Sequence, residues 1–259
     1  TGTLDRAALQ RTLDHVLARH ENLRTSFPTM DDRPQMRIHA DARFDLLCHD
    51  LGSLDAAAQI AEVERLRRLE AQTLFDIANG PLVRGRLLRL AEDNHLLLIT
   101  QHHIVSDAWS FGVMVREVNA LYDAFRAGRA DPLPALPIQY ADYAAWQRTE
   151  LSAERLDQQF AWWKAHLDGA PGLLDLPLDR PRPLAQRFEA ASLPVSLSPA
   201  LTAGLRALAA RHGCTLFMTV MAGWALLLSR LSSQDSVVIA SAITNRDRVE
   251  LEGLTGLFV

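Results

Sequence analysis

Two apolar runs near the middle of the sequence constrain the fold more than any other feature. The runs "PLVRGRLLRL" (81–90) and "NHLLLITQHHIV" (94–105) are rich in Leu, Ile or Val, and only "AED" separates them. Short apolar runs joined by a few polar residues are typical of a hairpin of buried strands. The sequence therefore predicts that two core strands pair here and that the other elements pack around them.

Helical patterns lie on both sides of this hairpin. Apolar residues recur at helical spacing in residues 4–24 and again in residues 53–73, where Ser53 is the expected N-cap. Residues 108–127 repeat the pattern, and Gly128 supplies a C-cap. Further helices are expected at about 138–149, 153–168, 199–212 and 214–231, the last buried in a core, and further strands within 23–27, 35–40, 44–51, 188–196, 236–243 and 254–259.

The order of these elements predicts the class and a division of the chain. Strands alternate with helices, which is typical of an α/β or α+β fold in two parts. Residues 169–186 carry four prolines and no periodicity, so the linker should lie there. We expect a first lobe over residues 1–170, a linker over 171–187 and the start of a second lobe over 188–259.

Charge, hydropathy and cysteines narrow the functional classes. The net charge is −4 without a basic stripe, which argues against nucleic acid as a partner. The most apolar stretch, 216–231, is interrupted by Ser229 and Arg230 and is short for a bilayer, so no membrane partner is expected. Cys48 and Cys214 have no zinc or redox spacing and indicate free thiols in a reducing, cytoplasmic setting.

Two adjacent histidines at the end of the second apolar run are the first candidate site. Strand geometry would turn His102 and His103 to opposite faces, so one could anchor the core while the other faces a cavity. Asp107 lies where it could cap a helix or accept a cation. From the residues alone, a packed histidine and a simple cap remain the simpler interpretation. A metal site is disfavoured, because no Cys or Glu lies near the histidines.

A resemblance to a known family favours the functional interpretation of the two histidines over the purely structural one. The segment "HHIVSDAWS" resembles the HHxxxDG signature of condensation domains of nonribosomal peptide synthetases, in the chloramphenicol-acetyltransferase-like superfamily. Four other stretches resemble motifs of that family in the same order, so the resemblance covers the whole chain. They are "RHENLRTSF" (19–27), "FDIANGPLVRGRLLRL" (75–90), "YADYAAWQR" (140–148) and "ITNRDRVELEGLTGLFV" (243–259).

The resemblance implies a two-lobed fold with a tunnel between the lobes. The first lobe would be nearly complete here and the second truncated, so we expect both ends of the sequence to be cut from a longer polypeptide and the chain alone to be inactive. Donor thioester and acceptor amine would arrive on the phosphopantetheine arms of an upstream and a downstream peptidyl carrier protein, next to an adenylation domain. The product would be an amide, and no cofactor would be bound directly.

The family's motifs assign roles to individual residues. His103 would be the catalytic histidine, acting as a general base, by positioning the amine or as a hydrogen-bond donor. His102 would be its buried structural partner, and Asp107 would pair with Arg246 across the lobes. Three neighbours complete the supporting set: Ala108, which replaces the motif's Gly and should be the first helical residue, Trp109 and Ser110.

Several alternatives within and outside this family stay open. An ester-forming condensation domain and a non-catalytic docking domain would carry the same motifs, although loss of the second histidine is typical of the latter. The order Trp109–Ser110 argues against an epimerization domain, and the intact His102–His103 pair excludes heterocyclization. A coenzyme-A-dependent acetyltransferase shares only the histidine motif. The identity and stereochemistry of donor and acceptor are not encoded in these motifs.

Overall fold

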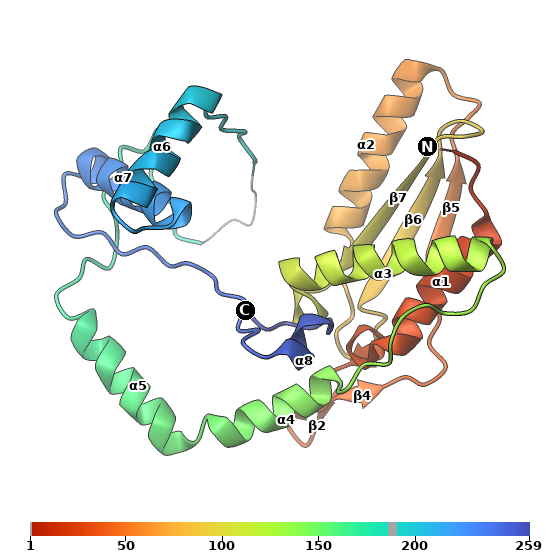
Figure 1. Ribbon diagram of the computed structural model, residues 1–259, viewed down its shortest axis with the longest axis horizontal. Helices are drawn as coiled ribbons and strands as arrows, with labels where there is room; N and C mark the ends of the chain where they lie inside the picture. Colours follow the sequence, from red (N-terminus) through yellow and green to blue (C-terminus); the bar gives the residue numbers. More distant parts are fainter. Residues whose placement is uncertain (1, 186–190) are drawn as a thin grey trace. The chain divides into compact units, whose positions relative to one another are not determined.

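A three-stranded sheet organises the first part of the chain, as seen in a computed structural model that describes residues 2–185 and 191–259 (Figure 1). Strands β5 (Leu46–Asp50) and β6 (Val83–Arg89) run parallel, and β7 (His95–Gln101) returns antiparallel to β6. The predicted hairpin of core strands is therefore confirmed. The parallel pair is joined through a helix, as parallel strands require.

Helices cover both faces of this sheet. On one face, α2 (Ala56–Gln72) packs Leu66 against the sheet. On the other face, α1 (Arg6–Arg19) and α3 (Ala108–Arg126) pack against each other and bury Leu87 of β6 between them and the sheet. These layers hold the largest hydrophobic core of the described chain, and α3 brings its first turn to the end of β7.

Two expected helix ends are displaced. The helix α2 begins later than expected, because Asp55 rather than Ser53 caps it, with its carboxylate accepting from the Ala58 amide at 2.8 Å. The helix α1 ends at Arg19, and the chain continues as a 3₁₀ turn, η1 (Glu21–Arg24). Buried side chains of η1 thereby face the core beneath the histidine motif.

Two short strand pairs follow η1, and only the first of them was expected. Strand β1 (Thr25–Ser26) pairs with β4 (Arg37–Ile38), and β2 (Thr29–Met30) pairs with β3 (Arg33–Pro34). Both pairs are antiparallel, so the predicted strands within 23–27 and 35–40 are confirmed. They form an extended loop below the main sheet.

The last residues of the chain pack beside α4 (Tyr140–Glu150) without forming a strand. Here α8 (Val249–Glu252) is followed by an irregular segment, and Phe258 joins a small core with Tyr143. The expectation of a strand at 254–259 is wrong, because the Phe258 amide donates to the carboxylate of Asp107 instead of to a strand.

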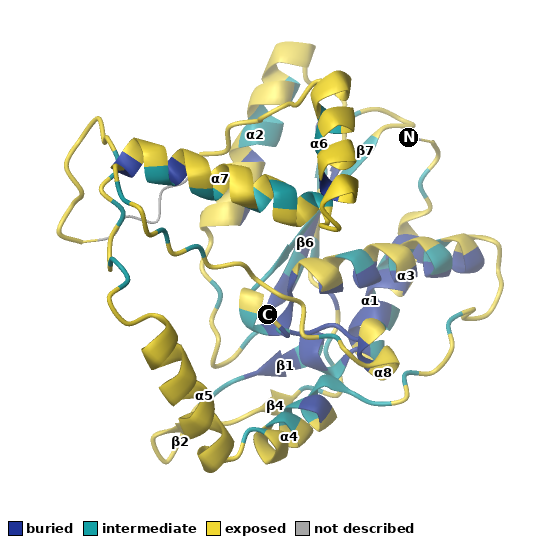
Figure 2. Ribbon diagram, turned by 60° about the vertical axis from the view of Figure 1, so that its left-hand side comes forward, coloured by how far each residue is buried: buried dark blue, intermediate teal, exposed yellow. Residues whose placement is uncertain are grey.

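Three helices make up the regular structure described between Ala153 and Ser241. They are α5 (Ala153–His166), α6 (Pro199–Arg211) and α7 (Leu216–Ser232). The expectation that 214–231 is a buried helix is wrong, because only Leu228 and Ser232 of α7 are buried (Figure 2). In the described chain only α6 packs along α7, which leaves most of its apolar side chains exposed.

Two other expected strands are not seen in this part. Residues 236–243 and 191–196 are irregular, since no strand lies beside them to complete a ladder within the described residues. Residues 188–190 of the expected strand at 188–196 lie outside the described residues.

The described chain forms two compact units whose limits differ from the expected lobes. One unit combines the residues up to Ser152 with Ala242–Val259, and the other is Ala153–Ser241. The lobe limits at 170 and 188 stay a prediction. Among the described helices none alone has the length and hydropathy to cross a membrane; α6 and α7, bent by 105°, reach that limit only as a pair.

Candidate functional site

The two histidines lie on a turn and not within a strand. Strand β7 ends at Gln101, and His102 caps the 3₁₀ turn η2 (His103–Val105), its Nδ1 accepting from the Ile104 amide at 3.1 Å. The β6–β7 ladder ends with the His102 amide, which donates to the Leu82 carbonyl at 2.9 Å, and the chain then leaves β7 for η2. Strand alternation is therefore the wrong reason for separating the two rings.

The turn nevertheless gives the two histidines different environments. The His102 ring is half-buried and makes an edge contact with Phe75, with 5.8 Å between ring centroids. The His103 side chain is exposed, while Val105 next to it is fully buried. The expected full burial of His102 is thus not observed, and the exposed ring is that of His103.

Asp107 connects the turn to helix α3 and is completely buried. Its Oδ1 accepts from the Ser110 amide and the Ser110 hydroxyl, each at 2.7 Å, and its Oδ2 accepts from the Phe258 amide at 3.2 Å. It is therefore both the N-cap of α3 and an anchor for the end of the chain. The two roles left open by the sequence coexist.

Arg246 supplies the charge opposite Asp107. Its Nη2 lies 3.3 Å from Asp107 Oδ1, and only 1% of the Arg246 side chain and none of the Asp107 side chain is exposed. Its Nη1 donates to the carbonyls of Leu251 and Leu254, and its guanidinium lies 3.7 Å from the ring centroid of Phe258. The structure thus brings together residues that are 139 positions apart.

The electrostatics of this pair follow from burial and hydrogen bonding. Burial raises the pKa of Asp107, but donation by the Ser110 hydroxyl and amide and the Phe258 amide, with the Arg246 charge, brings its pKa below the usual value. Burial lowers the pKa of Arg246, and Asp107 offsets part of that effect. Asp107 is therefore held as a carboxylate.

The remaining three residues of the predicted set surround this pair. Ala108 begins α3 with its side chain exposed, so a helical residue suits this position, as expected. Ser110 is buried and its Oγ accepts from Arg246 Nη2 at 2.9 Å. Trp109 is 41% exposed, and its Nε1 donates to the Glu252 carbonyl at 2.9 Å. Trp109 and Ser110 join the start of α3 to residues 246–256.

A second buried ionic cluster, absent from the sequence-based prediction, lies further along α3. The Glu117 carboxylate accepts from Arg19 Nε at 3.0 Å and lies 2.7 Å from His20 Nε2. Burial raises the pKa of Glu117, but these two partners outweigh it and the net pKa is lowered. The signal available in the sequence was the "RHE" at the start of "RHENLRTSF" (19–27), which places an arginine and a histidine side by side.

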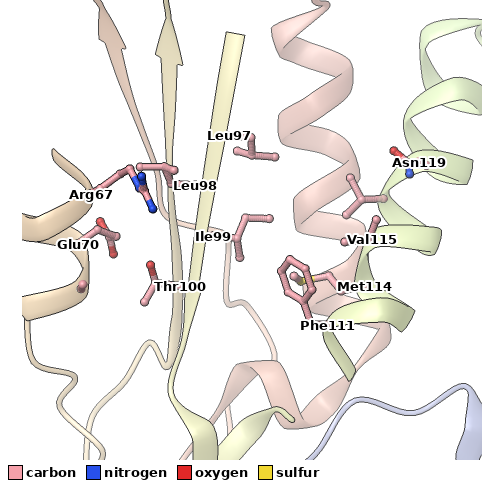
Figure 3. A pocket seen from close by; sticks show the side chains of 12 residues that line it. Arg67, Glu70, Leu97, Leu98, Ile99, Thr100, Phe111, Met114, Val115 and Asn119 are labelled. Carbon is pink, nitrogen blue, oxygen red and sulfur yellow. The ribbon is translucent and has the colours of Figure 1, made fainter. Parts of the chain in front are cut away.

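A cavity of about 500 Å³ runs along β7 between α2 and α3 (Figure 3). Arg67 and Glu70 line it from α2, Ile99 from β7, and Phe111 and Met114 from α3. His103 does not line this cavity, so a cavity facing His103 stays a prediction. No group of three or more His, Cys, Asp or Glu side chains suited to a metal occurs in residues 2–185 and 191–259.

Comparisons with known proteins agree on one family. The family model described as "Condensation domain" matches residues 1–259. Malpibaldin synthetase of Mortierella alpina is 49% identical over 260 residues, and a linear gramicidin synthase of Brevibacillus parabrevis is 43% identical over 258 residues. Each match covers 100% of this chain, which spans only 5% of the length of either relative.

Solved structures show the same fold. The X-domain in complex with OxyB from teicoplanin biosynthesis is 33% identical with a TM-score of 0.82, covering 99% of this chain and 56% of that one. The first condensation domain of the calcium-dependent antibiotic synthetase, solved with a substrate analogue, is 26% identical with a TM-score of 0.77, covering 99% of this chain and 60% of that one.

Proposed function

This chain belongs to the condensation-domain family of nonribosomal peptide synthetases, and we propose that it forms an amide bond between two carrier-bound substrates. The observation that carries the proposal is the exposed imidazole of His103 on a turn anchored by the buried residues Val105 and Asp107. The predicted fold class, a mixed helix–sheet fold of the chloramphenicol-acetyltransferase type, is confirmed by the structural matches.

The proposed reaction is an aminolysis of a thioester. The amine nitrogen of an aminoacyl group on a downstream carrier attacks the thioester carbonyl carbon of an acyl or peptidyl group on an upstream carrier. The C–N bond forms, the C–S bond breaks, and the amine proton leaves with the phosphopantetheine thiol. No cofactor takes part beyond the two arms, and an adjacent adenylation domain would supply the aminoacyl group.

His103 has three ways of assisting this step. An α-amino group has a pKa of about 7.7–8.0, so part of it is already neutral near pH 7. Holding amine and thioester together supplies roughly 7–11 kcal/mol of the barrier, and a general base adds about 10²- to 10⁴-fold. The ring can accept the amine proton, fix the amine, or donate to the developing oxyanion.

Asp107 and Arg246 support the site without reacting. Both side chains are buried, so neither is accessible to a substrate. Their pairing fixes the start of α3, and therefore the turn that precedes it, to residues 246–258. The free, exposed thiols of Cys48 and Cys214 support a reducing, cytoplasmic setting for the protein.

The test is a condensation assay on the protein in its natural full length. Donor and acceptor carrier proteins are loaded, and the carrier-bound amide is measured by mass spectrometry. We expect His103→Ala to lower the rate by about 10²- to 10⁴-fold. His15→Ala, at a partly exposed histidine on α1 that pairs with Asp131, is the control and should keep the wild-type rate. Product formation at the wild-type rate by His103→Ala would contradict the proposal.

A second candidate is a docking domain that recruits a partner without catalysis. The similarity to an X-domain that was solved in complex with OxyB supports it. A docking domain predicts that the wild-type protein captures a partner protein and forms no amide, with His103→Ala binding equally well. If amide formation occurs and depends on His103, the protein is a condensation enzyme and not a docking domain.

A further inference from the structure

Asn22 is a buried polar residue directly beneath the turn that carries His103. It lies in η1 and is 2% exposed. Its Nδ2 donates to the carbonyl oxygen of Val105 at 2.7 Å. Val105 is the last residue of η2, two positions after His103, so Asn22 contacts the turn at the end opposite to His102.

The position of the His103 ring depends on this turn. Within the described chain no hydrogen bond holds the exposed His103 imidazole, so the backbone of the turn is what fixes the base of this side chain. That backbone is held at one end by the His102 amide, which donates to Leu82 at 2.9 Å. At the other end it is held by the buried Val105 side chain and by Asn22.

The chemistry of Asn22 indicates that the Nδ2 donor, and not the side-chain carbonyl, is the group that the turn requires. Its Oδ1 is buried and finds no partner among the described residues, which costs free energy. An apolar residue of similar size would avoid that cost, but it would leave the Val105 carbonyl unpaired. The motif RHExLRTxF leaves this position open, so the family resemblance assigns Asn22 no role.

We propose that Asn22 is a positioning residue for the condensation step, holding the Val105 carbonyl and through it the imidazole of His103. This inference rests on the proposed function, because it takes His103 as the reacting histidine. Asn22 touches neither substrate nor the His103 ring, so its effect passes through the backbone of η2.

The first measurement tests whether the hydrogen bond from Asn22 to the Val105 carbonyl, here called the clamp, holds the turn η2 in place. It needs no enzymatic activity. Hydrogen exchange of the protein in its natural full length is compared for wild type, Asn22→Leu and Thr12→Val. Thr12 is the matched control: it is fully buried on α1, and its hydroxyl has no partner in the described residues. We expect amides of residues 103–106 to exchange at least about tenfold faster in Asn22→Leu and to stay unchanged in Thr12→Val.

Equal exchange in the two variants would overturn the clamp. Asn22→Asp, which keeps the shape of the side chain and replaces the donor by an acceptor, is the second variant if Asn22→Leu does not fold. It should also accelerate exchange of residues 103–106, because the carboxylate and the Val105 carbonyl repel each other.

The second measurement tests the consequence for catalysis. We expect Asn22→Leu to lower kcat by roughly 10- to 100-fold, with KM for both carriers within about twofold of wild type. In a His103→Ala background the same change should cost nothing further, because the positioned group is gone. Losses that multiply in the double variant, or an unchanged kcat in Asn22→Leu, would overturn the positioning role. A wild-type protein that forms no amide refutes the proposed function, while hydrogen exchange still reports on the clamp.

Discussion

Replacing Asp107 by Ser separates the two roles of this carboxylate, which caps helix α3 and also binds Arg246 and the Phe258 amide. Serine caps a helix about as well as aspartate, so the bond to the Ser110 amide has a substitute. Serine cannot replace the ion pair with Arg246 or accept the bond from the Phe258 amide in the same way. Any loss of stability in Asp107→Ser therefore measures the contacts that reach residues 246–258.

The size of that loss follows from the burial of Arg246. Breaking a buried pair by removing one partner costs about 3–5 kcal/mol. Arg246 keeps its bonds to the Leu251 and Leu254 carbonyls, so we expect the lower end, about 3 kcal/mol. For a domain of this size that lowers Tm by roughly 6–12 °C.

Thermal unfolding of the protein in its natural full length is the assay, with Asp55→Ser as control. Asp55 is also an N-cap, on α2, but it is exposed and caps only the Ala58 amide. Its replacement should change Tm by no more than about 2 °C. Equal Tm shifts in the two variants would refute the ion pair as a source of stability. A cycle with Arg246→Ala should give a double variant less harmful than the sum of the singles.

The effect of pH has a defined sign. The folded state holds the pKa of Asp107 below its usual value, so the carboxylate stabilises the protein fully above about pH 4. That stabilisation is lost as the pH falls through the folded pKa. The stability difference between wild type and Asp107→Ser should therefore be constant from about pH 7 to 5 and shrink below about pH 4.

Two further substitutions test the packing around α3 and the end of the chain. Glu117→Gln should lose about 3 kcal/mol in denaturant unfolding, because it leaves the largely buried Arg19 guanidinium without its anion. Glu64→Gln, in an exposed pair on α2, should change stability by less than about 0.5 kcal/mol, and equal losses would contradict the argument. Gly256→Ala should cost at least about 1–3 kcal/mol, since its Cβ would overlap the ring of Tyr140, while Gly253→Ala, with 3.6 Å to its nearest neighbour, should be tolerated.

The sequence predicts those elements that depend on a repeat of apolar residues within one segment. The β6–β7 hairpin and the helices were visible because apolar residues repeat within each segment. The strands expected at 236–243 and 254–259 failed because a strand exists only with a partner, and apolar content does not reveal one.

The candidate site shows the same limit. The pairing of Asp107 with Arg246 came from the family resemblance and not from spacing. The contact of Asn22 with Val105 spans 83 residues and involves a backbone carbonyl, which leaves no trace in the sequence. Side-chain contacts to backbone groups of a distant turn are beyond what periodicity can encode.

Arg246 follows Asp107 by 139 positions in the chain, and this separation determines when during synthesis the ion pair can form. At about 5–20 residues per second, a ribosome needs roughly 7–28 s to add the arginine after the aspartate. During that interval α3 can dock on the sheet, but its capping carboxylate has no cation. The nascent chain therefore passes through a stage in which the turn carrying His103 is already made and its anchor is not, and a ribosome stalled before residue 246 would display the least stable form of this site.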